Sequence, residues 1–397
     1  MPRDSRRLGC IVIALLGANL AHATNGTMFH GYGARSQAMG GVGIGYIQDS
    51  HVGASNPAGF GMLGDRQDID VAVMRGDRGA VLNGRDIDSN GKEIYVFPAV
   101  GWARTLSDQV GVGFSLYTLG AGTVYREPVV TGPVTSPTKN TEAELAQLVF
   151  SPGVSFQVNE RHRVGFGLSL AYQQFYVQGV EPILGNPGKD RGFGAGFNLG
   201  WYGKLTDQLS MGVSYYSKVK MEKLEKYEHL LANKGEMDIP ERYGVGFAYL
   251  VSPKTTLAMD YLHINYGGVK SLSNSVYAFL DPASPMGSRN GPGFGWKRQN
   301  VYKFGIAHQH DEKLTLRAGY SRATDVIPEK ETALNYLAQV TPKEHFTLGA
   351  SMKRDSGGEW SLAYTYSPKN TIKGSGMLSQ QTDLYHQQHW IVVGYGW

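Results

Sequence analysis

The stretch VGFGLSLAY, residues 164–172, decides the fold class of this chain. The even-numbered residues from 164 to 172 are Val, Phe, Leu, Leu and Tyr, and the residues between them are Gly, Gly, Ser and Ala. Successive side chains of a β-strand point to opposite faces, so each set occupies one face. The second face carries small residues rather than Lys and Glu, which suits a lumen with something packed inside it better than a solvated surface. The stretch therefore predicts a wall strand of an all-β protein.

The same alternation recurs from about Gln67 to Trp397. Residues 193–201 read FGAGFNLGW and residues 360–366 read WSLAYTY, with apolar residues at every second position. This pattern predicts fourteen strands, at residues 67–76, 93–103, 110–126, 143–157, 163–178, 192–203, 209–224, 238–250, 255–267, 295–308, 314–322, 345–353, 359–367 and 385–397.

The connections between these strands are alternately long and short. The short ones are Arg104–Gln109, Val158–His162, Lys204–Gln208, Val251–Lys254, Gln309–Lys313 and Arg354–Gly358. The long ones lie near residues 77–92, 127–142, 179–191, 225–237, 268–294, 323–344 and 368–384. Tight turns at one end and long loops at the other are typical of barrels in the cell outer membrane of Gram-negative bacteria. We therefore predict a transmembrane antiparallel β-barrel of about 14 strands over residues 65–397, with both ends of the sheet on the periplasmic, short-turn side.

The composition fits a barrel and argues against several other classes. The 397 residues include 53 Gly and 23 Tyr, 18% of them are charged, and the formal net charge is +4. Mean hydropathy is −0.28, and no stretch after residue 24 approaches the roughly 20 apolar residues of a spanning helix. The scattered positive charge argues against a nucleic-acid partner. The single cysteine, Cys10, lies in the N-terminal segment, so we expect no disulfide or thiol chemistry in the mature chain.

Residues 1–23 have the pattern of a secretory signal peptide. A basic region with three arginines precedes an apolar region at 8–20, and AHA at 21–23 is a small-x-small cleavage site. We expect the mature chain to begin at Thr24. Removing three Arg and one Asp changes the formal charge from +4 to +2.

Residues 24–64 do not alternate and are rich in glycine. They include GYGARSQAMGGVGIG at 31–45 and NPAG at 56–59. Glycine at this density permits tight backbone packing and positive φ angles. Fourteen strands enclose more room than an eight-stranded barrel, whose interior side chains fill it. We therefore predict that residues 24–64 form an N-terminal hatch that plugs the lumen.

These N-terminal residues resemble the start of the FadL/TodX family of outer-membrane transporters for long-chain fatty acids and hydrocarbons. The matching elements are Arg35 with Ala38-Met39-Gly40-Gly41, and Asp49 with Asn56-Pro57-Ala58-Gly59; segments at 111–125, 192–220, 239–241 and 295–297 follow in family order. The resemblance implies passive uptake of a hydrophobic small molecule, captured at the outer loops and held in a lumenal pocket. It also implies lateral exit beside a kinked third strand. The partners that it implies are outer-membrane lipid, lipopolysaccharide and the barrel-assembly machinery, and we expect no cofactor.

Two short segments are candidates for controlling the ligand path. Leu119-Gly120-Ala121-Gly122 interrupts the alternation of its strand, and glycine inside a strand often marks a bulge or a close backbone approach. The alternative is that Gly120 and Gly122 only relieve crowding. The resemblance makes Gly120, Ala121 and Gly122 the kink of the third strand and places Asn56, Pro57 and Ala58 against it. We expect these three hatch residues to gate the path, although Asn56 could also serve only in packing.

A ligand with a carboxylate should meet a cation in the lumen. Lys297 is the candidate that the resemblance implies. Alternation along their strands points Lys303 and Arg317 into the lumen as well. The alternative for all three is pairing with a carboxylate of the hatch or wall.

Several other motifs are incomplete. The sequence DIDSNG, which runs from Asp86 through Asn90 to Gly91, resembles the start of a twelve-residue calcium loop. The twelfth position of such a loop would be Phe97, where a bidentate Glu is needed. A turn is expected there instead. The histidines near 308–310 and 386–389 lack carboxylates at metal-ligand spacing, so we expect no metal site. Neither a phosphate-binding glycine motif nor a GxSxG nucleophile motif occurs, and we expect no enzyme.

Two other functions remain open for such a barrel. One is a water-filled general diffusion porin, and the other is a surface adhesive barrel with long outer loops. The hatch argues against the porin, because a porin has no need of it. The loops near 127–142 and 179–191 are short in comparison with the best-known members of the family that the chain resembles, in which they build the outer capture groove. A smaller groove leaves room for a compact hydrocarbon and leaves chain-length preference open.

Overall fold

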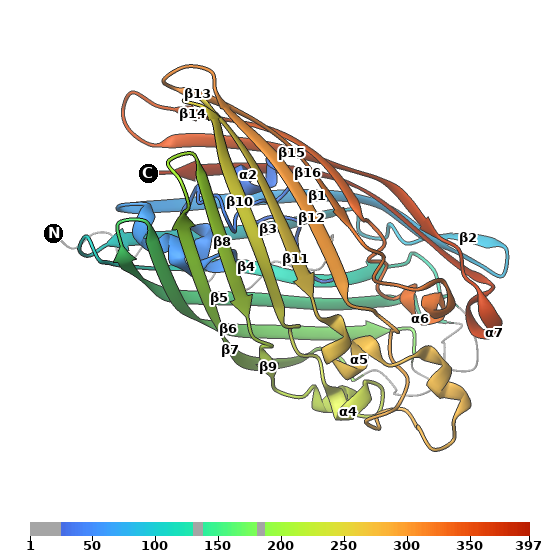
Figure 1. Ribbon diagram of the computed structural model, residues 1–397. Helices are drawn as coiled ribbons and strands as arrows, with labels where there is room; N and C mark the ends of the chain where they lie inside the picture. The colour runs from blue at the N-terminus through green and yellow to red at the C-terminus, as the bar shows by residue number, and fades with distance from the viewer. Residues whose placement is uncertain (1–24, 130–137, 181–186) are drawn as a thin grey trace.

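The computed structural model describes residues 25–129, 138–180 and 187–397, and its strands form one closed antiparallel barrel (Figure 1). The signal peptide expected at 1–23 lies outside the described residues. The wall strands are β1 (Arg66–Leu82), β3 (Ile94–Thr105), β4 (Val110–Val124), β5 (Glu142–Asn159), β6 (His162–Gln178), β7 (Asp190–Lys204), β8 (Leu209–Tyr216), β10 (Arg242–Ser252), β11 (Thr255–Ile264), β12 (Gln299–Gln309), β13 (Leu314–Ala323), β14 (Glu344–Lys353), β15 (Glu359–Ile372) and β16 (Thr382–Gly396). The sheet closes because β16 pairs with β1. Two further strands, β2 (Arg85–Asp88) and β9 (Lys220–Met221), pair with single neighbours, so the fourteen wall strands confirm the prediction.

The strands differ from the predicted ones mainly at the end that carries the long loops. β1 and β16 are longer than predicted because they stay paired as far as Leu82 and Thr382. β8 stops at Tyr216 rather than near residue 224. Beyond an interruption at Ser217–Val219 the chain pairs with β7 again as β9, and Val219, which is buried, bridges to Ile239.

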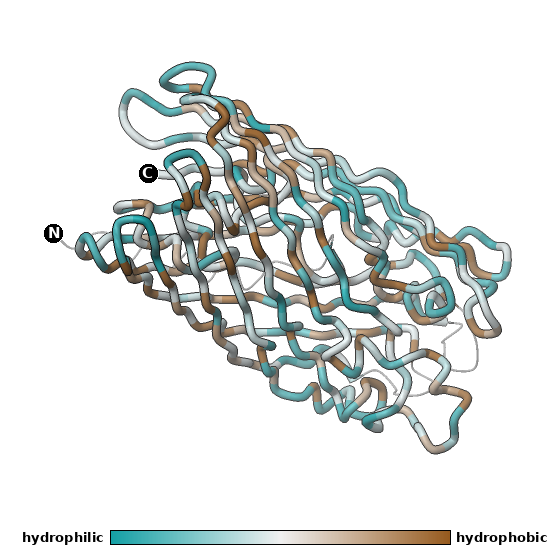
Figure 2. Tube along the Cα trace, in the orientation of Figure 1, coloured by the Kyte–Doolittle hydropathy of each residue, from teal (hydrophilic) through white to brown (hydrophobic). Residues whose placement is uncertain are grey.

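The alternation of side chains is as predicted. Phe166, Leu168 and Leu170 of β6 are each more than 40% exposed and face outward, whereas the Gly, Ser and Ala between them face the interior. Turns at both ends are mostly hydrophilic, and hydrophobic residues are spread along the strands (Figure 2). A closed barrel pairs its backbone groups between strands, which a lipid environment requires.

The hatch, residues 25–64, lies inside the barrel. It contains α2 (Ala34–Gln37) and the 3-10 helices η1 (Ser50–Ala54) and η2 (Pro57–Met62), and most of its residues are buried. Glycine is required where its backbone passes close to another chain segment. Gly41 has φ +87° and a Cβ there would collide with the carbonyl of His30, and a Cβ on Gly212 of the wall would collide with the carbonyl of Ile44. The glycine-rich sequence thus lets the hatch fill the lumen.

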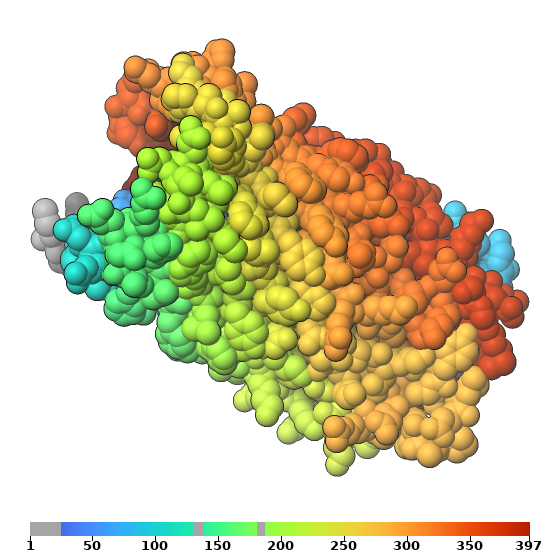
Figure 3. Space-filling model, in the orientation of Figure 1, coloured from blue at the N-terminus to red at the C-terminus, as the bar shows by residue number. Residues whose placement is uncertain are grey.

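Short helices in the loops cover the end of the barrel opposite the C-terminus (Figure 1). They are η3 (Glu225–Tyr227), α4 (Ala232–Gly235), η4 (Tyr266–Gly268), α5 (Lys270–Ser273), η5 (Val276–Leu280), η6 (Glu329–Glu331), α6 (Thr332–Asn335) and α7 (Gly376–Ser379). Across the described residues, none of the helices has both the length and the apolar character to cross a membrane. On the face drawn in Figure 3, the strands and loops form a continuous surface.

Candidate ligand path through the barrel

The wall is interrupted between β3 and β4. Their pairing begins between Thr105 and Gly111 and ends between Val100 and Leu116. On its other side, β4 stays paired with β5 as far as Val124. The segments 94–99 of β3 and 117–124 of β4 therefore face one another without a ladder, and we call this gap the window.

The upper half of β4 is buried on both faces. In its lower half buried and half-exposed residues alternate, but every residue from Tyr117 to Thr123 is buried. The Thr123 hydroxyl donates to the carbonyls of Tyr336 and Leu337, at 3.1 and 3.0 Å, so this segment packs on the loop that contains α6.

The predicted kink residues lie within this buried segment, beyond the part of β4 that pairs with β3. The N–H of Gly120 donates to the carbonyl of Thr27 in the hatch, at 3.0 Å. A Cβ on Gly122 would collide with the carbonyl of Ala143 on β5, so glycine allows the close approach of these strands. Ala121 is buried in the apolar cluster of the lumen.

The Asn56-Pro57-Ala58 motif is placed differently from the expectation. Asn56 is fully buried, and its amide donates to the carbonyls of Ile44 and Trp201, each at 2.9 Å. Its Oδ1 accepts from the N–H of Ala58 at 3.1 Å and so caps η2. The motif packs on the glycines of β6, β7 and β8 rather than on the β4 kink, and the expected contact with the kink is wrong. These wall glycines leave room for the hatch backbone, whereas the Tyr117–Thr123 segment is packed against Thr27 and the outer loop.

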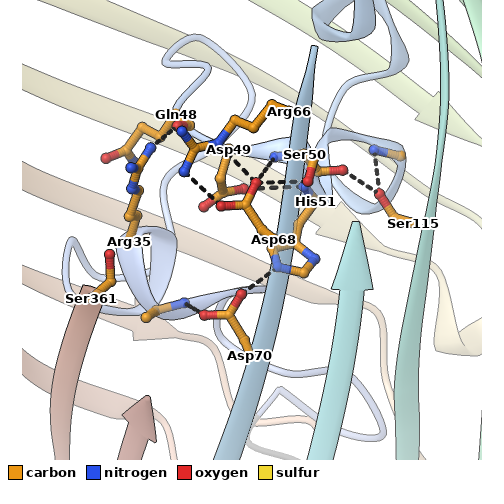
Figure 4. A network of polar contacts seen from close by, with 12 residues as sticks. Arg35, Gln48, Asp49, Ser50, His51, Arg66, Asp68, Asp70, Ser115 and Ser361 are labelled. Carbon is orange, nitrogen blue, oxygen red and sulfur yellow. Dashed lines mark hydrogen bonds and ion pairs between the residues drawn. The ribbon is translucent and has the colours of Figure 1, made fainter. Parts of the chain in front are cut away.

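A buried polar network fastens the hatch to β1 (Figure 4), and an ion pair fastens it to β15. His51 Nε2 lies 2.6 Å from Asp70 Oδ2, and the N–H of Ala34 donates to the other oxygen of Asp70 at 2.8 Å. Arg35 pairs with Glu359 of β15 at 2.7 Å. Burial disfavours the charged imidazole, but the Asp70 carboxylate outweighs it and raises the pKa of His51 to about 9. His51 is therefore a cation at neutral pH.

A cavity with a free volume of about 40 Å³ lies between the hatch and the wall. Apolar and aromatic groups such as Phe29 and Tyr32 line it, together with the charged groups Arg242, Asp260 and Lys303. Asp260 accepts from the N–H groups of Gly43 and Ile44, at 2.7 and 3.0 Å, which ties it to the hatch.

Arg242, at the start of β10, was not found from the sequence. It is 4% exposed, it donates to the carbonyl of Ala54 at 3.0 Å and the hydroxyl of Tyr117 at 3.3 Å, and its guanidinium stacks 4.0 Å above the Tyr216 ring. No carboxylate among the described residues pairs with it. Its only signal in the sequence is its place one residue after Glu241, which does not distinguish it from other strand-end cations.

The three cations named from the sequence lie in different places. Lys303 is buried, and its ammonium donates to the carbonyl of Gly41 at 2.9 Å. Arg317 donates to Gln48 of the hatch at 3.1 Å and to Ser351 of the wall at 2.6 Å. Lys297 is exposed. Lys303 and Arg317 thus point inward onto the hatch, and Lys297 does not line the cavity.

Three further cavities lie among the loops, the wall and the hatch. An outer groove with a free volume of about 60 Å³ is lined by residues that include Phe279, Phe294 and Leu337. The next cavity shares Phe294 and Leu337 with the groove and reaches Thr27 and Ala121. A third, on the inner side of the window, is lined by residues of the hatch, β3 and β4, namely Phe29, Gly31, Tyr32, Gly33, Gln37, Asp70, Ala72, Phe97, Pro98, Ala99, Tyr117, Thr118 and Val392. The first two of these cavities share lining residues, whereas the third shares Phe29 and Tyr32 with the cavity beside the hatch.

The segment considered as a calcium loop forms a hairpin. Asp86 and Asp88 belong to β2, whose turn is Asn83-Gly84, with φ angles of 51° and 77°. The Asp86 carboxylate accepts from the hydroxyl of Tyr385 at 2.8 Å. Over the described ranges, no three His, Cys, Asp or Glu side chains come together in a way that could hold a metal ion.

Comparisons with known proteins agree with this architecture. The model of a family described as outer membrane protein transport protein (OMPP1/FadL/TodX) matches residues 29–336. The structure is similar to the Pseudomonas putida toluene transporter TodX, with 19% identity and a TM-score of 0.73 over 92% of this chain and 98% of TodX. It is also similar to the Ralstonia pickettii toluene transporter TbuX, with 15% identity and a TM-score of 0.68 over 92% of this chain and 98% of TbuX. A third similar structure is that of a Pseudomonas aeruginosa FadL homologue, with 13% identity and a TM-score of 0.67 over 96% of this chain and 99% of the homologue.

One curated relative is similar over a short region. It is described as an uncharacterized protein in the phosphoenolpyruvate carboxykinase gene 5′ region of Chlorobium limicola, and it is 44% identical over 61 residues. These residues are 15% of this chain and 30% of the relative's length. The family match, in contrast, covers most of the chain. The protein therefore belongs to the OMPP1/FadL/TodX family of outer-membrane transporters for hydrophobic compounds.

Proposed function

We propose that this protein facilitates passive uptake of hydrophobic compounds, long-chain fatty acids or hydrocarbons, and releases them sideways through the window. The observation that carries this proposal is the loss of β3–β4 pairing beyond Val100 and Leu116, beside a cavity that contains residues of both strands. Lateral release delivers an apolar compound into the bilayer, so the compound avoids transfer into water.

The outer groove would capture the compound first. Its lining is mostly apolar and includes Phe279, which is 39% exposed. Burial of each CH₂ group contributes about 0.8 kcal/mol, so a hydrocarbon can bind there with few polar contacts. The relatives TodX and TbuX are described as toluene transporters, which supports a compact aromatic compound as cargo here.

The described conformation is a closed one. The outer groove and the cavity beside the hatch have free volumes of about 60 and 40 Å³, whereas a cavity that binds benzene has about 150 Å³. Side chains or part of the hatch must therefore move before a ligand passes. Asn56, Pro57 and Ala58 act in this step by holding the hatch on β7, at a distance from the window.

For a cargo with a carboxylate, we propose Arg242 as its first cationic contact. Arg242 faces the cavity without a carboxylate partner in the described chain, while Lys303 and Arg317 already bind the hatch. The alternative contacts are Lys297, Lys303 and Arg317. Substituting each cation in turn and measuring carboxylate binding shows which of them makes the contact.

Uptake into cells that lack their own transporter tests the proposed function. The cells would express this protein or the Asn56→Ala/Pro57→Ala variant and receive labelled toluene or a labelled long-chain fatty acid. We expect at least one compound to enter faster with the intact protein than with empty cells, and more slowly with the variant. Entry of neither compound above background, from a barrel shown to be folded, would contradict the proposal and favour the porin or adhesive alternatives.

A further inference from the structure

Arg78 of β1 is a fully buried arginine that connects three parts of the wall. It is 1% exposed. Its Nη1 donates to the carbonyl of Gly122 on β4 at 3.0 Å, and its Nη2 donates to the hydroxyl of Tyr95 on β3 at 2.6 Å. Nη2 and Nε also reach the carbonyls of Lys92 and Ser89, at 3.3 and 3.4 Å. One side chain thus holds β1, the start of β3 and the kinked part of β4.

These contacts lie at the upper end of the window. Gly122 comes six residues after Leu116, the last residue of β4 that pairs with β3. In an intact sheet, a backbone N–H of the neighbouring strand would bond a carbonyl in this place. Here the Arg78 guanidinium donates to the Gly122 carbonyl instead. Just beyond it, the N–H of Gly91 donates to the carbonyl of Val124 at 2.8 Å and closes the wall again.

The window therefore has two different rims. The lower rim is the backbone pair of Val100 and Leu116, which belongs to the ladder of the sheet. The upper rim is a side chain, held by hydrogen bonds from a charged donor in a buried place, where such bonds are strong and their loss is costly. A side-chain rim can differ between proteins without any change in the strand order.

We propose that Arg78 determines the size of the compounds that leave through the window. This rests on the proposed lateral release, and it makes Arg78 a specificity-determining residue of that step. A long, rigidly held guanidinium keeps Gly122 close to Tyr95 and so limits the window to compact or narrow cargo. A smaller side chain at position 78 removes these contacts and vacates its volume, so the opening becomes larger.

The test compares a compact with a bulky aromatic hydrocarbon, toluene and biphenyl, in cells that express the wild-type, Arg78→Ala, Arg78→Lys or Tyr95→Phe protein. We expect Arg78→Ala to raise the ratio of biphenyl to toluene uptake several-fold. Arg78→Lys should give a smaller rise, because one ammonium cannot bond both the Gly122 carbonyl and the Tyr95 hydroxyl in the same geometry. Tyr95→Phe removes only the hydroxyl, which accepts from Arg78 and donates to the carbonyl of Lys92, and it retains the arginine. We therefore expect it to give the smallest rise, and it tests the proposal if Arg78→Ala does not fold.

A second readout does not depend on transport. Thr118 lines the inner side of the window and is 2% exposed, so a Thr118→Cys variant should react slowly with a bulky lipid-soluble maleimide. Adding Arg78→Ala should accelerate this reaction. Unchanged uptake ratios together with an unchanged labelling rate, in folded protein, would overturn the role of Arg78. If neither hydrocarbon enters through the wild type but labelling still accelerates, the proposed transport fails and the role of Arg78 at the window stands.

Discussion

The backbone N–H of Gly120 donates a hydrogen bond of 3.0 Å to the carbonyl oxygen of Thr27. Through it, the first described residues of the hatch occupy an edge of β4 that has no β3 partner. The adjacent residue Gly26 packs on the Tyr266 ring, and the hydroxyl of Tyr266 donates to the carbonyl of Asn25. The start of the hatch is therefore held between the kink and the loop that follows β11. A ligand that displaces residues 25–28 would also free the edge of the window.

Asn56→Ala should loosen the hatch. It removes both donors to the carbonyls of Ile44 and Trp201 and leaves these buried acceptors unsatisfied, at a cost of roughly 2–4 kcal/mol. We expect faster proteolysis of the hatch in the folded barrel. Asn159→Ala is the control, because the Asn159 side chain accepts only from turn N–H groups at the short-turn end. Equal proteolysis rates for the two variants would show that Asn56 does not hold the hatch.

The hatch should also loosen at high pH. The pKa of His51 is raised from 6.5 to about 9 by Asp70, so the stabilisation is fully present below about pH 6.5, declines as the pH rises and is lost above about pH 9. A shift of this size corresponds to at most about 3 kcal/mol. Proteolysis of the hatch measured from pH 6 to pH 10 should accelerate for the wild type and much less for His51→Gln. The same acceleration in both proteins would assign the effect to other groups.

Arg242→Gln should weaken binding of an aromatic or fatty carboxylate by roughly tenfold, since a hydrogen bond to a charged group contributes about 1.5–3 kcal/mol. Binding of the matching hydrocarbon should change little, which separates loss of a ligand contact from a general disturbance of the hatch. Lys297→Gln, Lys303→Gln and Arg317→Gln, titrated with the same pair of compounds, show whether another cation makes the contact. If one of these three variants loses more carboxylate binding than Arg242→Gln does, that cation and not Arg242 makes the contact.

Phe279→Ser should reduce capture at the outer groove. Phe279 lines the groove and is partly exposed, so the substitution removes apolar surface without opening the barrel core. At low concentrations of hydrocarbon, we expect initial uptake to fall several-fold. Met377→Ser is a matched control, because Met377 is 62% exposed on α7 and does not line the groove. Equal uptake by the two variants would exclude the groove as the capture site.

The wall of this protein could be predicted from sequence because a period of two is a local signal. Each predicted strand, including the one at 164–172, has a corresponding wall strand in the structure. The Gly-Ala-Gly segment at 120–122 lies in the part of β4 that is not paired with β3. The glycine-rich start also predicted a plugged lumen. These features depend only on which residues follow one another.

Other features depend on which surfaces meet. The placement of Asn56 is set by the fit of η2 to glycines on three separate strands, and no spacing in the sequence contains that fit. Arg242 and Arg78 are single cations on ordinary strands, and only the fold shows that both are buried. The interruption between β8 and β9 likewise has no signal in the alternation, since both strands pair with β7.

Lateral exit through the window is the central claim, and a cross-link across the window tests it most directly. Ala99→Cys and Thr118→Cys line the same cavity from β3 and β4, and a reducible cross-linker can join them. Val100→Cys and Leu116→Cys, paired at the lower rim, are the control, since their strands are already held together there. We predict that cross-linking the first pair abolishes toluene uptake, that reduction restores it, and that the control pair transports at the wild-type rate when cross-linked. Uptake that continues through a fully cross-linked window would contradict the claim.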